Sequence, residues 1–179
     1  MQTAEGNKPV TELIDFLKVQ KPLKELKMED ALRNASCIHV KEQSSGETGH
    51  KSSNGSSFAE RAIQEGINKT GYFLGENMAY GSEDAKMALY TLAIDDGVPN
   101  RGHRKNIFQE NFSSVGICVG NHATFKKVAG IIYRGKYSDT GLDTKSISGR
   151  KQVKMVEQKE EADQNKNDEL TKEAVVEST

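Results

Sequence analysis

The chain has 179 residues and a net charge of −1, with 25 Lys+Arg residues against 26 Asp+Glu residues. This balance offers no basic excess for binding nucleic acid, and no stretch approaches the roughly 18 apolar residues of a membrane-spanning helix. The last 36 residues, 144–179, carry 15 charged side chains and no aromatic residue. Such a segment cannot bury enough apolar surface to offset its ordering entropy. We therefore expect one folded domain over residues 1–143 and a disordered charged tail over residues 144–179 that is dispensable for stability.

Sequence patterns predict three helices in the N-terminal half of the domain. Apolar residues on one side predict a first helix over residues 11–19. Apolar positions that recur every three or four residues predict a second helix over residues 28–41. A loop rich in Ser, Gly and Thr leads to a third helix over residues 57–66, which opens with the capping-box pattern of Ser57 and Glu60.

The C-terminal half contains one further helix and two strands. Ser82 is expected to cap the helix, and Gly97 is placed to end it. Residues 115–119 and 128–133 are apolar runs of strand type, separated by a turn over residues 120–122. Helices first and strands last predict an α+β fold, with helices packed on a mostly antiparallel sheet.

The two cysteines, Cys37 and Cys118, allow one disulfide at most. Each lies in or beside an apolar pattern, so small buried side chains explain both. We therefore expect no essential structural bridge. The alternative is that both side chains point into the same layer and pair.

Four histidines are candidates for chemistry, and none lies in a short metal-binding signature. His39 is interpreted as a packing residue beside the apolar face of its helix, and His122 as a turn residue. His50 and His103 lie in polar loops, and Glu76 lies between them in the sequence Gly-Glu-Asn. Two imidazoles and several carboxylates on separate loops suit a metal site, a general acid–base pair or no site at all.

The amino-acid sequences of three segments resemble motifs of one known family. Gly-Glu-Asn-Met-Ala at residues 75–79, Gly-His-Arg-Lys-Asn-Ile-Phe at residues 102–108 and Val-Gly-Ile-Cys-Val-Gly at residues 115–120 occur in that order. They resemble the CAP superfamily, also called the SCP domain, whose members include cysteine-rich secretory, antigen 5 (allergen V5-like) and pathogenesis-related 1 proteins. The Gly-His-Arg form is similar to the microbial and protist branch. The resemblance covers residues 10–137 and implies an α-β-α sandwich with a surface cleft.

The resemblance also implies a set of cleft residues. His50, Glu76 and His103 match three of the four positions in the family's cleft. The aligned acid at the fourth position is Asp96, with Asp95 as the alternative. The tryptophan that the family usually carries nearby is absent, because the chain has none. Two neutral imidazoles with two carboxylates suit Zn²⁺ or another divalent cation.

The function that the resemblance implies is a binding or effector module whose cleft engages a ligand or partner, with a lipid or sterol among the candidates. The alternative is a metal-dependent hydrolase with Glu76 as general base, and a scaffold that merely inherits the four residues is a third. The family implies an extracellular protein. The N-terminus lacks an apolar signal core, and without a signal the location would be cytoplasmic. Four N-glycosylation sequons favour the extracellular location: Asn34, Asn54, Asn68 and Asn111.

Overall fold

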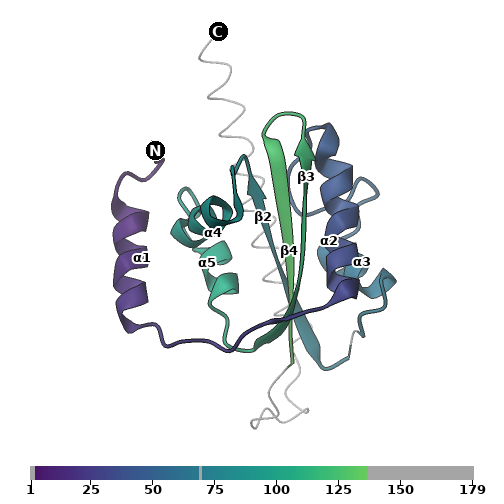
Figure 1. Ribbon diagram of the computed structural model, residues 1–179, viewed down its shortest axis with the longest axis horizontal. Coiled ribbons are helices and arrows are strands. Elements are labelled where there is room, and N and C mark those ends of the chain that lie inside the picture. The colour runs from purple at the N-terminus through teal and green to yellow at the C-terminus, as the bar shows by residue number, and fades with distance from the viewer. Residues whose placement is uncertain (1–2, 69, 137–179) are drawn as a thin grey trace. The chain divides into compact units, whose positions relative to one another are not determined.

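A computed structural model describes residues 3–68 and 70–136 of the chain (Figure 1). The expected tail over residues 144–179 and the expected domain end at residue 143 lie outside the described residues.

A four-stranded sheet forms the centre of the described fold, with the strand order β1-β3-β4-β2. Strand β1 pairs in parallel with β3, and the β3–β4 and β2–β4 pairs are antiparallel. Because β2 has only one neighbour, it forms an edge of the sheet. The strands span Lys27–Met28 (β1), Tyr72–Tyr80 (β2), Phe112–His122 (β3) and Lys126–Lys136 (β4).

Helices cover both faces of the sheet. Figure 1 shows α2 and α3 on one face and α4 and α5 on the other, with α1 beyond them. This arrangement confirms the expected α+β class and the α-β-α sandwich. The helices span Lys8–Val19 (α1), Asp30–Glu42 (α2), Phe58–Gln64 (α3), Ala85–Ile94 (α4) and Gly102–Ile107 (α5), and a 3₁₀ turn, Gln43–Ser45, follows α2.

Helix α2 lies directly on the sheet. Its buried apolar residues Leu32, Ala35 and Val40 recur at helical spacing and face β3 and β4. At Gly116 of β3 a Cβ atom would collide with the backbone of Leu32 and Arg33. Glycine therefore permits the close approach of helix and strand at this point.

Several local details differ from the sequence-based expectations. Asp84, not Ser82, caps α4, because its side chain accepts a hydrogen bond from Met87 N. The hairpin turn between β3 and β4 lies at residues 123–125, so residues 120–122 belong to β3. The capping box of Ser57 and Glu60 is confirmed.

The expectation that the cysteines form no bridge is wrong. Cys37 and Cys118 form a disulfide, with their Cα atoms 5.1 Å apart. The bond joins α2 to β3. Because α2 packs over β3, residues 81 positions apart in sequence come to face each other in one layer, which is the alternative that the sequence left open.

Among residues 3–68 and 70–136, no helix has the length and apolar character that crossing a membrane requires.

Candidate functional site

Strand β2 carries two adjacent polar residues that are both buried, Glu76 and Asn77. Successive side chains of a strand point to opposite faces of the sheet. Glu76 accordingly contacts Arg61 of α3, whereas the Asn77 side chain donates to the carbonyl of His103 on α5. The edge strand thus has one half of the candidate site on each side.

The first half of the site is a chain of His50, Glu76 and Arg61. His50 Nδ1 lies 2.8 Å from Glu76 Oε2, and Arg61 Nη2 donates to Glu76 Oε1 at 2.5 Å. The Glu76 side chain is 1% exposed, whereas the His50 side chain is 38% exposed. A buried carboxylate held by a guanidinium therefore fixes the orientation of an imidazole that faces solvent.

Arg61 also shapes the loop on which His50 lies. Its Nη1 donates to the carbonyl oxygens of His50 and Ser56 and to Ser52 Oγ, at 3.0–3.3 Å. A single buried arginine therefore ties the loop backbone to the carboxylate that contacts His50.

A buried polar network holds the same loop from the other side. Tyr80 donates to Gln43 Oε1 and accepts from Gly49 N, while Gln43 Nε2 donates to the Gly49 carbonyl. His39 Nε2 lies 2.9 Å from the same carbonyl. His39 is buried, as its interpretation as a packing residue required, but it packs as part of the network that positions Gly49, the residue before His50. Burial raises the pKa of Tyr80, which keeps its hydroxyl as a donor.

The second half of the site is the pair of His103 and Asp95. His103 Nδ1 lies 2.6 Å from Asp95 Oδ1, and the second carboxylate oxygen accepts from Arg104 N at 3.1 Å. Asp95 ends α4 with a left-handed backbone, φ 58°. Its side chain is 1% exposed and that of His103 is 25% exposed. The second half repeats the first, with a buried carboxylate behind an accessible imidazole.

Asp96, the first choice for the fourth position of the cleft, does not pair with His103. Its carboxylate accepts hydrogen bonds from the backbone N–H groups of Ala4 and Glu5, at 2.6 and 3.0 Å. Asp95, the alternative, contacts His103 instead. The left-handed turn at Asp95 directs the two adjacent aspartates to different partners, which an alignment of motifs cannot resolve.

Arg101 fastens the N-terminal segment to the loop between α4 and α5. Its guanidinium donates to both carboxylate oxygens of Glu5, at 2.6 and 2.8 Å, and to Glu12 at 2.8 Å. It also donates to the carbonyls of Asp95 and Val98. The hydrogen bonds from Arg101 lower the pKa of Glu5 from its usual 4.5 to about 2. This cluster fixes the turn that separates Asp95 from His103.

Asn106 of α5 ties the two halves to the same strand. Its Nδ2 donates to the Glu76 carbonyl at 3.2 Å and to Asn77 Oδ1 at 2.9 Å. Within the described residues, no hydrogen bond or ion pair joins the His50–Glu76 pair directly to the His103–Asp95 pair. The backbone of β2 and the amides of Asn77 and Asn106 provide the connection.

The comparisons with known proteins agree with this architecture. The family model of CAP, the cysteine-rich secretory protein family, matches residues 18–133. This chain belongs to the CAP family. The match contains all four residues of the two pairs.

Three solved structures that are similar to this CAP domain come from bacteria. An extracellular protein with an SCP domain from Bacillus anthracis has a TM-score of 0.52 and 19% identity, over 73% of this chain and 41% of that one. An outer surface protein from Borrelia burgdorferi has a TM-score of 0.49 and 14% identity, over 76% of this chain and 97% of that one. The CAP domain of enterococcal PrgA has a TM-score of 0.43 and 18% identity, over 68% of this chain and 57% of that one. The chain thus spans less than half of the first of these proteins. None of the curated proteins matches it in sequence.

The CAP domain does not present the expected four residues as four metal ligands. Both oxygens of Glu76 and both of Asp95 already accept hydrogen bonds. Over residues 3–68 and 70–136, no three His, Cys, Asp or Glu side chains are grouped so as to hold a metal ion. The Nε2 atoms of His50 and His103 make no hydrogen bond to that part of the chain. Of the expected residues, His50 and His103 therefore keep a ring nitrogen without a hydrogen bond to the described residues, and each has a carboxylate on the other ring nitrogen.

Sequence reasoning missed several residues that build the site. In the sequence, Arg61 resembles an exposed charged residue of an amphipathic helix, and no pattern predicted that it is buried. Asn77 and Asn106 lie inside the motifs quoted for the family, so their positions in those motifs were the available signal. Arg101 directly precedes the Gly-His motif, but its partners lie about 90 positions away in sequence.

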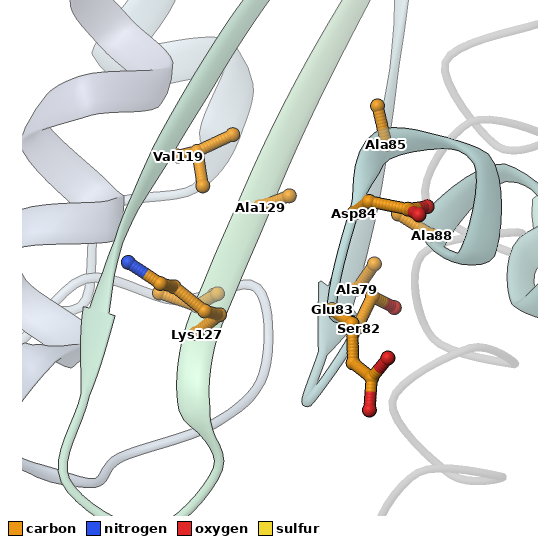
Figure 2. Close-up of a pocket in the computed structure, with 10 residues that line it drawn as sticks. Ala79, Ser82, Glu83, Asp84, Ala85, Ala88, Val119, Lys127 and Ala129 are labelled. Carbon is orange, nitrogen blue, oxygen red and sulfur yellow. The ribbon is translucent and has the colours of Figure 1, made fainter.

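An apolar pocket of about 140 Å³ lies elsewhere, between the start of α4 and the sheet (Figure 2). Figure 2 shows Ala79 and Ala129 on the sheet side, Ala85 and Ala88 on the helix side, and Val119 at its margin. None of the four expected cleft residues lines it. Its volume is below the roughly 300 Å³ of the smallest ordinary ligand pockets, so it gives no support to a sterol.

Proposed function

We propose that this chain is an extracellular CAP-domain binding protein that takes a divalent cation such as Zn²⁺ between His50 and His103. The observation that carries the proposal is the repeated arrangement of the two histidines. Each has Nδ1 against a buried carboxylate and Nε2 free of hydrogen bonds to the described residues. Histidines that bind metals almost always donate the other ring N–H to a carboxylate, a backbone carbonyl or water.

In this proposal Glu76 and Asp95 orient the imidazoles and do not bind the cation. Each keeps its histidine in the tautomer that has the proton on Nδ1 and the lone pair on Nε2. A cation held by two imidazoles keeps coordination positions for water or for an anionic group of a ligand. The bound cation would supply positive charge to recruit such a group, and the protein would supply the fixed geometry.

The contacts of Glu76 do not favour the hydrolase alternative. A general base must reach a proton of the reacting water or substrate. Glu76 is buried, and its two oxygens contact Arg61 and His50. If the protein turned over ester, peptide or glycan substrates, and Glu76→Gln lost this activity with the fold intact, the hydrolase alternative would be favoured.

The test is calorimetric titration with Zn²⁺ of the parent protein and of single-histidine variants. His50→Ala and His103→Ala should each lose binding. His122→Gln is the matched control, since both nitrogens of His122 contact backbone groups and its side chain is buried. Binding should weaken at acidic pH, because protons compete for the same nitrogens. Equal affinity in the parent and both alanine variants would contradict the proposal.

The location outside the cell is supported by two observations. A similar solved structure, with an SCP domain, is described as an extracellular protein. Disulfides such as Cys37–Cys118 form and persist in oxidising environments.

A further inference from the structure

The four N-glycosylation sequons form a set that the candidate site does not use. All four asparagines have exposed side chains, although they lie on different elements: Asn34 on α2, Asn54 before α3, Asn68 after α3 and Asn111 before β3. A linked glycan must project into solvent, and each of these positions allows that.

Two of the sequons share one local conformation. Asn54 Oδ1 accepts a hydrogen bond from Ser56 N, and Asn68 Oδ1 accepts one from Thr70 N, both at 2.9 Å. These are Asx turns, in which the asparagine oxygen is used and the amide nitrogen is not. Neither Nδ2 atom donates to any residue that the structure describes. A sugar attached at Nδ2 would therefore displace no protein hydrogen bond.

The other asparagines show that this is not a general property of the fold. Asn77 and Asn106 lie outside sequons, and both use Nδ2 to donate to groups of the site. Asn34 lies within α2, and the hydroxyl of its sequon, on Ser36, is 1% exposed. Asn111 is also exposed and is followed by the exposed Ser113, but among the described residues only the sequon asparagines Asn54 and Asn68 accept a hydrogen bond from the backbone N–H of their own hydroxyl residue.

We propose that Asn54 and Asn68 are N-glycosylation sites. In this reaction Nδ2 attacks the anomeric carbon of a lipid-linked oligosaccharyl diphosphate. The new N–C bond forms as the C–O bond to the diphosphate breaks, and the lipid diphosphate leaves with the electron pair. The amide nitrogen loses one proton, and nothing is oxidised or reduced.

The fold supports this modification in two further ways. The Cys37–Cys118 disulfide is of the kind made in the oxidising compartment where such glycans are added. Asn54 and Asn68 flank α3, and Figure 1 shows α3 and α5 on opposite faces of the sheet. Glycans at both positions would therefore be attached beside α3, on the face of the sheet opposite to α5.

The experiment expresses the full chain behind a secretion signal in a eukaryotic host and maps glycans by mass spectrometry after peptide-N-glycosidase treatment in H₂¹⁸O. We expect ¹⁸O-labelled aspartate at positions 54 and 68. Ser56→Ala and Thr70→Ala should each remove one glycan while keeping the Asx turn, which uses only the backbone N–H. Ser56→Thr should retain the glycan. A secreted protein whose mass does not change on enzyme treatment would overturn the proposal, as would a Ser56→Ala/Thr70→Ala double variant with the parental glycan mass.

Discussion

Replacing Arg61 by methionine removes the cation that contacts the buried carboxylate of Glu76. The two side chains are 2% and 1% exposed, so solvent screens their interaction little. Removing one partner of a buried ion pair costs about 3–5 kcal/mol, because the other charge stays buried without a partner. Arg61→Met also takes donors from the carbonyls of His50 and Ser56, and each lost hydrogen bond adds about 1 kcal/mol.

We therefore expect Arg61→Met to lower the free energy of unfolding by about 4 kcal/mol or more. Arg61→Lys keeps the charge but cannot make the same set of bonds, so it should fall between the parent and Arg61→Met. Glu76→Gln and the Arg61→Met/Glu76→Gln double variant complete a double-mutant cycle, and the coupling energy should be about 1–3 kcal/mol.

Urea unfolding of the five proteins measures these differences. A loss below about 1 kcal/mol in Arg61→Met, or additivity within about 0.5 kcal/mol in the cycle, would refute the reasoning. Either result would show that Arg61 and Glu76 do not act as a buried pair.

Two further predictions concern the bonds that hold distant segments together. The disulfide closes a loop of 81 residues, for which chain entropy gives about 4.5 kcal/mol. The Cys37→Ala/Cys118→Ala double variant should lose about 2–5 kcal/mol of unfolding free energy, and two titratable thiols in the denatured, unreduced parent would contradict the bridge. The pKa of Glu5, about 2, lies below its usual 4.5. Its stabilising effect should therefore be complete above pH 4.5 and vanish as pH falls through 2. The Tm of Glu5→Gln should be below that of the parent at pH 7 and should approach it below pH 2, and equal values at pH 7 would contradict the role of Glu5.

Helices α1 to α4 were predictable because their signals are local, whereas the expectation that His103 lies in a polar loop is wrong, because it lies in the short helix α5. The capping box of Ser57 and Glu60 lies within a few residues and is confirmed. The apolar spacing of the second helix is confirmed for Leu32 and Ala35, whereas Met28 lies in β1 and is exposed. Strand β2 was not predicted from periodicity. Its central residues Gly75, Glu76 and Asn77 break the alternation of a strand, since two polar side chains are buried there for the site.

The parts of the site that could not be predicted depend on contacts distant in sequence. Arg61 contacts Glu76 across 15 positions, and Arg101 contacts Glu5 across 96. Nothing near either arginine in the sequence distinguishes it from a solvated charge. The resemblance to the CAP family provided His50, Glu76 and His103, but the choice between Asp95 and Asp96 depended on one left-handed residue at the end of α4.

The central claim is that two carboxylate-oriented imidazoles take a cation together. A crystal structure of the full chain with Zn²⁺, with anomalous data collected at the zinc edge, tests it most directly. The account predicts one zinc ion about 2.0–2.1 Å from Nε2 of both His50 and His103, with Glu76 and Asp95 still on the Nδ1 atoms. An ion bound by the carboxylates, by only one of the two histidines, or at another place in the domain would contradict it.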